Sequence, residues 1–233
     1  MQAERDSQIV GWIGGLGAAG AEHVMARFAM GRSWAYGRLR LLVRDGLLAQ
    51  HRVLYGRPGL YVATRPGLRW RGLGELGVYR VAPGAFEHAW QVAGVAVALA
   101  RCLPGWRVLS DREIRWKERE EQKLLASVKV GSMGGGVAAL HRPDLALLSP
   151  RGRVVAVEVE LSVKARSRLL AICRGWARAQ HVDAVYYLAT SPAAGAVRRA
   201  VGETRSEDRV CVLALGQAGA LVERERGGDH GLR

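Results

Sequence analysis

The sequence predicts a two-domain protein of the mixed α/β (α+β) class. Three observations lead to this class. Short helical patterns followed by two β-rich runs fill the first 75 residues, strand-like and helix-like segments alternate from residue 85 onward, and a stretch rich in glycine lies between them. With 233 residues, 49% of them hydrophobic, the chain can form two separate cores. We therefore expect domains at 1–75 and 85–222, a linker at 76–84 and a disordered tail at 223–233.

The first domain is expected to open with three helices and to close with a β-hairpin. The helices are predicted at Ser7–Ile13, Ala21–Met30 and Ser33–Asp45. In the third helix, Ala35, Leu39 and Leu42 recur at helical spacing and define a core side. The hairpin is predicted from two β-rich runs, Leu47–Tyr55 and Leu60–Ala63, around a Gly-Arg-Pro-Gly turn. Two helices joined by a tight turn and followed by a hairpin indicate a winged helix-turn-helix domain, and DGLLAQHRVLYGRPGLYVATRPG resembles the end of the recognition helix and the wing of bacterial winged-helix proteins.

Basic residues on this domain point to DNA. The formal net charge is +14, and arginine, which suits bidentate phosphate and guanine contacts, supplies most of it. The predicted DNA-contacting residues are Ser33, Tyr36, Arg40 and Arg44 on the outer side of the third helix and Arg52 and Arg57 on the hairpin. The alternative is that this helix packs on a protein partner and that its arginines are only solvated.

The second domain is expected to alternate helices and strands. A helix at Ala85–Cys102 precedes a strand at Trp106–Trp116, and Gly131–Gly136 forms a mobile loop. Two strands then follow, one headed by Asp144 and one at Val154–Leu161, joined by a tight turn at Ser149–Gly152. The remaining elements are a helix at Ser162–Gln180, a strand at Val182–Leu188, a helix at Pro192–Gly202 and a strand at Arg209–Leu215. This order predicts a mixed sheet flanked by helices.

Three carboxylates gather on this pair of strands. Glu158 and Glu160 are two residues apart, so they share one face of the second strand, and Asp144 heads the neighbouring strand. Converging carboxylates form an oxygen-rich site that suits a divalent metal. The alternative is the solvated face of an edge strand, but the remaining Val and Ala residues indicate a strand that is buried on both faces.

The stretch PDLALLSPRGRVVAVEVELSVK resembles the core motif of the PD-(D/E)xK nuclease superfamily, which has the restriction-endonuclease-like fold. The resemblance implies that Asp144 and Glu158 bind Mg²⁺ or Mn²⁺. Position 160, usually Lys in this motif, is Glu160, as in an E-x-E variant, and Lys164 then stands for the displaced Lys. The first helix of this fold sometimes carries a further metal ligand, for which Glu87 is the candidate, and Arg168 is expected beside the DNA backbone. Together with the N-terminal domain, HRPDLALL and VVAVEVELSVKARSRL resemble the replication-relaxation family of actinobacterial plasmids and integrative elements.

Two functions follow as expectations. The first is a Mg²⁺-dependent DNA endonuclease or nickase with Asp144, Glu158, Glu160 and Lys164 as catalytic residues. The second is a non-catalytic DNA-binding replication or mobilisation factor, or a repressor, that keeps the nuclease fold as a scaffold. The expected partners are double-stranded DNA, a second copy of the chain, and replication or transfer proteins of a mobile element. Three scattered cysteines and the absence of a long apolar stretch favour a cytoplasmic, nucleoid- or plasmid-associated protein without a membrane partner.

Overall fold

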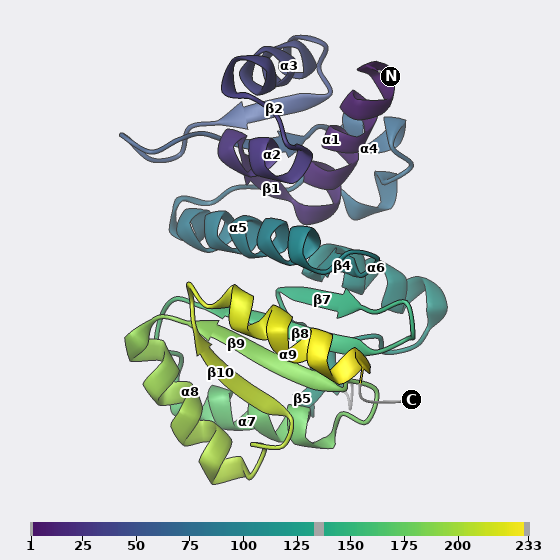
Figure 1. Cartoon of the computed structure of the whole chain (residues 1–233). Coiled ribbons are helices and arrows are strands. Elements are labelled where there is room, and N and C mark those ends of the chain that lie inside the picture. The colour runs from purple at the N-terminus through teal and green to yellow at the C-terminus, as the bar shows by residue number, and fades with distance from the viewer. Residues whose placement is uncertain (1, 133–137, 231–233) are drawn as a thin grey trace. The chain divides into compact units, whose positions relative to one another are not determined.

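The computed structural model describes residues 2–132 and 138–230 and divides into two compact units, residues 1–97 and 98–233 (Figure 1). Both units combine helices with strands, which confirms the predicted mixed α/β class. The division falls inside a helix, α5 (Phe86–Cys102), and not in the predicted linker at 76–84. The reason is that the start of α5 belongs to the core of the first unit, where Phe86 packs with Ala18, Leu60 and Val62.

The first unit places four helices around a small antiparallel sheet. Its elements are α1 (Gln2–Leu16), β1 (Ala18–Gly20), α2 (Ala21–Phe28), α3 (Arg32–Arg44), β2 (Leu48–His51), β3 (Leu60–Ala63), α4 (Arg65–Trp70), two short 3₁₀ turns and the start of α5. The strand order is β1-β3-β2. The core side predicted for the third helix is confirmed, because Ala35, Leu39 and Leu42 are buried in one cluster with residues of α1 and β3.

Thr64 and Gly67 fix the end of the hairpin. Thr64 caps α4 by accepting a hydrogen bond from Gly67 N at 3.2 Å, and its hydroxyl also donates to Leu47 O at 3.2 Å. A Cβ on Gly67 would lie 2.1 Å from Leu47 O. Only glycine therefore allows α4 to pack this closely against the backbone of Leu47, the residue that precedes β2.

The second unit contains a five-stranded mixed sheet, a two-stranded hairpin and helices. Its elements are β4 (Arg107–Ser110), α6 (Asp111–Glu121), β5 (Val128–Ser132), β6 (Ala138–His141), β7 (Leu145–Leu148), β8 (Val154–Glu160), α7 (Arg166–Arg178), β9 (Ala184–Ala189), α8 (Ser191–Thr204), β10 (Val210–Ala214) and α9 (Ala218–His230). The sheet order is β10-β9-β8-β7-β4, with β8, β9 and β10 parallel and β4 and β7 antiparallel to their neighbours. Helices α7 and α8 pack on one face through Ala156, Val185 and Tyr187.

Several elements of this unit differ from expectation. The strand predicted up to Trp116 stops at Ser110, which caps α6 in a capping box with Glu113. The helix predicted from Ser162 begins only at Arg166, so Lys164 precedes it. The loop predicted at Gly131–Gly136 starts inside β5, and its residues 133–136 lie outside the described residues.

The tail expected to be disordered from residue 223 instead continues α9 to His230, and residues 231–233 lie outside the described residues. Glu225, which is 1% exposed, anchors this helix to the sheet. Its carboxylate accepts hydrogen bonds from Arg153 Nε at 2.8 Å and from the Tyr186 hydroxyl at 2.7 Å. Within the described residues, no helix has the length and apolar character needed to cross a bilayer.

Candidate functional site

The acid cluster, defined as Asp144, Glu158 and Glu160, sits where β7 and β8 pair. The antiparallel ladder of these two strands ends at the pair Leu145 and Val157, and Asp144 and Glu158 lie just beyond that pair. Asp144 Oδ2 accepts a hydrogen bond from Val159 N at 2.8 Å, which ties its carboxylate to β8. Every residue of β8 after Val154 is buried, including both glutamates, as expected for a strand that is covered on both faces.

Glu158 has a histidine partner that the sequence analysis did not identify. Its Oε1 lies 2.5 Å from His141 Nε2, and only 3% of the Glu158 side chain is exposed. His141 ends β6, and its ring packs edge-on against Trp176 of α7, with 5.8 Å between the centroids. A buried carboxylate needs such a partner, because the desolvation of an unpaired charge is expensive.

His141 lies at the end of the β5–β6 hairpin. Glu118 of α6 fixes the segment that leads into this hairpin. Glu118 Oε1 accepts hydrogen bonds from three successive backbone N–H groups at 2.9–3.1 Å. Its other oxygen accepts from the Ser127 hydroxyl at 2.5 Å. His141 lies only three residues before Asp144, but the sequence carries no signal that its ring turns back onto β8.

Glu160 pairs with Lys164, so the structure brings together these two predicted residues. The Lys164 ammonium forms an ion pair with Glu160 Oε2, where 5% of the Glu160 side chain and 32% of the Lys164 side chain are exposed. Lys164 belongs to the loop before α7 and therefore reaches back without being fixed by helical geometry. Arg168, on the first turns of α7, is exposed.

The charge of Glu158 affects two buried neighbours. Burial first, and then the nearby Glu158 carboxylate, raise the pKa of the Cys173 thiol to about 11. The same two causes, in the same order, raise the pKa of Tyr187 well above its usual value. Tyr187 also accepts a hydrogen bond from Trp176 Nε1 at 3.3 Å. Cys173 is thus a buried core thiol whose ionisation is disfavoured.

The acid cluster does not fit a divalent metal as it is arranged. Each carboxylate is engaged by a donor of the protein: Asp144 by Val159 N, Glu158 by His141 and Glu160 by Lys164. Across residues 2–132 and 138–230, no group of three or more His, Cys, Asp and Glu side chains is placed to hold a metal ion. Glu87, the further candidate ligand, instead pairs with Arg57 of the first unit at 3.3 Å.

A second concentration of predicted residues is the α3–hairpin face of the first unit, defined as Ser33, Tyr36, Arg40, Arg44, Arg52 and Arg57. All are exposed except Tyr36, which is half-buried. Within the described residues, Arg40 and Arg52 form no ion pair or hydrogen bond, and Arg44 contacts only the exposed Asp45, at 3.0 Å. By contrast, Arg38 on the inner side of α3 forms a bidentate ion pair with Asp6 of α1. Arg40 and Arg52 therefore remain available to a ligand, whereas Arg57 pairs with Glu87.

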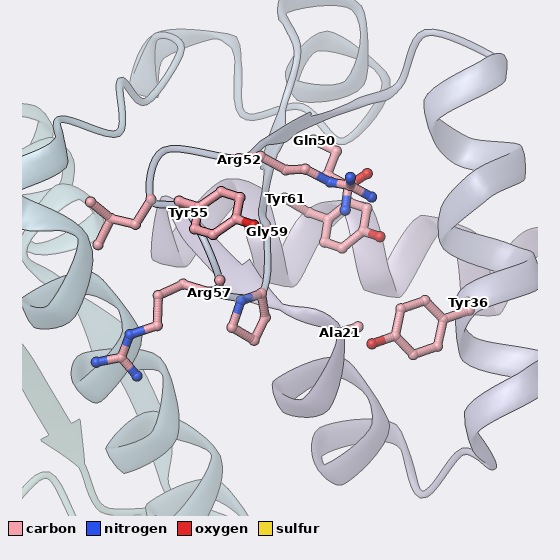
Figure 2. Close-up of a pocket in the computed structure, with 11 residues that line it drawn as sticks. Ala21, Tyr36, Gln50, Arg52, Tyr55, Arg57, Gly59 and Tyr61 are labelled. Carbon is pink, nitrogen blue, oxygen red and sulfur yellow. The ribbon is translucent and has the colours of Figure 1, made fainter.

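A cavity of about 570 Å³ opens between α3, the start of α2 and the hairpin (Figure 2). Figure 2 shows Tyr36 on one side of this cavity and Tyr55 and Arg57 on the other. Tyr61 on β3 lines it from below the surface, and burial, followed by the neighbouring Tyr36, raises the pKa of its hydroxyl, although Arg52 and Arg40 act in the opposite sense. Tyr55 and the cavity itself were not predicted from the sequence.

Searches of protein-family models, curated proteins and solved structures found no match to this chain. Its function must therefore be inferred from the two sites themselves.

Proposed function

We propose that this chain is a DNA-binding protein that uses the α3–hairpin face. The observation that carries this proposal is that Arg40 on α3 and Arg52 on the hairpin are exposed and have no ion-pair or hydrogen-bond partner within the described residues. The element order α1-β1-α2-α3-β2-β3, with strand order β1-β3-β2, agrees with a winged helix-turn-helix. In that arrangement the second helix of the pair enters the major groove, and the hairpin contacts the neighbouring backbone or minor groove.

The overall charge supports the same partner. The excess of 35 Lys and Arg over 21 Asp and Glu gives the chain a formal charge of +14. Several acidic groups are used inside the fold, including Asp6, Glu118, Glu158, Glu160 and Glu225, so they oppose an approaching polyanion less than exposed acids would. Binding should therefore be strong at low salt. It should weaken steeply as the salt concentration rises, because salt cations compete with the protein for the DNA phosphates.

Fluorescence anisotropy with labelled duplex DNA tests this proposal. The double change Arg40→Gln and Arg44→Gln should lower the binding free energy by about 1–2 kcal/mol. It should also make the slope of log affinity against log salt concentration shallower, by the equivalent of about two phosphate contacts. The matched control is Arg65→Gln with Arg69→Gln, which removes the same charge from exposed positions of α4 in the same unit. Equal losses from the two pairs would mean that net charge, and not α3, drives binding.

DNA cleavage is the second candidate, and one observation favours it. Asp144 accepts a hydrogen bond from the backbone of Val159, the residue between the two glutamates, and Glu160 forms an ion pair with Lys164. The order β4-β7-β8-α7-β9 also agrees with a restriction-endonuclease-like core. Against it stands the internal pairing of all three carboxylates.

Supercoiled plasmid distinguishes the two candidates. The protein is incubated with plasmid and either Mg²⁺ or Mn²⁺, and nicked or linear product is measured on a gel. Cleavage that is abolished by Asp144→Asn but kept by Asp208→Asn, an exposed aspartate of the same unit, would favour the nuclease. DNA binding without any product would leave the non-catalytic function, with the second unit as a scaffold.

A further inference from the structure

The cavity between α3 and the hairpin has a composition that a DNA duplex does not need. Three tyrosines line it, namely Tyr36, Tyr55 and Tyr61, together with Gln50, Arg52 and Arg57. The other lining residues are small or apolar, and the lining contains no carboxylate. A phosphate backbone would gain from the two arginines but not from the aromatic and apolar walls.

The size of the cavity suits a single nucleotide. Small-molecule sites typically have volumes of about 300–1,000 Å³ and combine apolar walls with a few polar groups. At about 570 Å³, this cavity is within that range. Its polar groups come from β2 and the adjoining chain, where Gln50 and Arg52 lie beside Tyr61 (Figure 2). An amide and a guanidinium can read the edge of a base, because they offer donors and an acceptor in fixed directions.

Tyr55 indicates that the ligand is bound through the flat face of its base. Its side chain is fully exposed at the hairpin loop, at 107% of the reference value, next to the exposed Leu54. An aromatic ring in this state has both faces free for a ligand. Bases in a duplex are stacked on one another, so only an unpaired base offers its face to such a ring.

We propose that this cavity receives an unpaired base, so that the DNA the protein prefers is a duplex with an extruded, bulged or single-stranded nucleotide. This inference rests on the proposed function, because α3 and the hairpin arginines hold the adjoining duplex. Tyr55 stacks on the base, Gln50 and Arg52 face its edge, and Arg57, which pairs with Glu87 in the free protein, lies near the flanking phosphate.

Three labelled probes of one sequence test the inference in the full-length protein: a perfect duplex, the same duplex with one bulged nucleotide, and the single strand. The wild type should bind the bulged duplex about tenfold more tightly than the perfect duplex, since stacking on an aromatic side chain contributes about 1–3 kcal/mol per base. Tyr55→Ala should reduce this preference to about twofold or less, and Tyr55→Phe, which keeps the ring, should preserve it. A 2-aminopurine at the bulge should change fluorescence on binding to the wild type but not to Tyr55→Ala.

The control variant is Trp70→Ala, which removes an exposed aromatic side chain of the same unit that does not line the cavity. It should leave the preference unchanged. Equal affinity of the wild type for the bulged and perfect duplexes would overturn the inference while leaving the proposed function intact. Failure to bind any of the three probes would overturn both.

Discussion

The α3–hairpin face, represented by Arg40, and the acid cluster, represented by Glu158, differ in the exposure and pairing of their charged side chains. On the α3–hairpin face, arginines are exposed, and Arg40 and Arg52 have no partner within the described residues. In the acid cluster, the glutamates are almost fully buried and each has a side-chain partner, His141 for Glu158 and Lys164 for Glu160. A charge that is buried must be paired for the fold to be stable, whereas an exposed charge stays free for a ligand. The contrast supports our proposal that the first region binds a ligand, while the charged groups of the second region pair inside the fold.

The largest effect is expected where a buried pair is broken. His141→Phe fills the same space but leaves the Glu158 carboxylate without its partner, and it should lower the free energy of unfolding by about 3–5 kcal/mol. Adding Glu158→Leu should recover most of the loss, because it removes the orphaned charge. Urea unfolding of the three proteins measures both effects. A loss below about 1 kcal/mol for His141→Phe would show that the pair is not structurally required.

The matched comparison is the exposed pair of Arg44 and Asp45, whose side chains are 71% and 49% exposed. Asp45→Asn should change the free energy of unfolding by less than about 0.5 kcal/mol, since water and salt screen exposed pairs. The difference between the unfolding free-energy changes of His141→Phe and Asp45→Asn measures how much more a buried pair contributes to stability than an exposed one.

The next effect concerns His23, a buried residue of the first unit. It tests whether burial, and not the unit in which a side chain lies, determines whether its charged form is disfavoured. Burial lowers the pKa of His23 to about 4, and its Nδ1 accepts a hydrogen bond from Gly20 N at 3.0 Å. Above pH 6.5 the ring is neutral in both states. As the pH falls from 6.5 to 4, the unfolded chain takes up the proton first, so stability should fall by up to about 3 kcal/mol.

His23→Gln supplies the control, because glutamine at this third helical position can accept the same backbone hydrogen bond and does not titrate. The measurement is the difference between wild-type and variant unfolding free energies at pH 7, 5.5 and 4.5, which cancels other titrating groups. A difference that stays constant with pH would contradict the assignment of a buried neutral His23.

The last comparison concerns Gly37, on the outer side of α3. A Cβ at Gly37 would meet no atom within 4 Å, so packing does not require glycine there. Gly37→Ala should stabilise the protein by about 1 kcal/mol, the usual difference between these residues inside a helix. It should also weaken duplex binding about threefold or more if the backbone of α3 approaches DNA closely at this point.

Gly195→Ala is the control for Gly37, since Gly195 lies inside α8 and its Cβ would have only an ordinary contact with Arg199. It should raise stability without any change in DNA affinity. If Gly37→Ala also leaves the affinity unchanged, α3 does not come closest to the DNA at this position.

Local patterns in the sequence predicted the mixed α/β class and the buried side of α3. The apolar spacing of Ala35, Leu39 and Leu42 gave the core side of α3, and the alternation along β8 placed Glu158 and Glu160 on one face. The start of α6 could have been predicted as well, because Ser110 and Glu113 have the spacing of a capping box. The helix α9 could not, since its anchor is Glu225, whose partners Arg153 and Tyr186 lie 72 and 39 residues away.

The sequence by itself determined which side of each element is buried and which residues share a face, because these follow from the periodicity of helices and strands over a few residues. Only the tertiary structure decided which charged groups meet. It turned His141 onto Glu158, brought Lys164 back to Glu160 and left Arg40 and Arg52 without a partner within the described residues. The physical reason is that pairing depends on how distant segments pack, and the desolvation of buried charge selects among arrangements that a local pattern cannot distinguish.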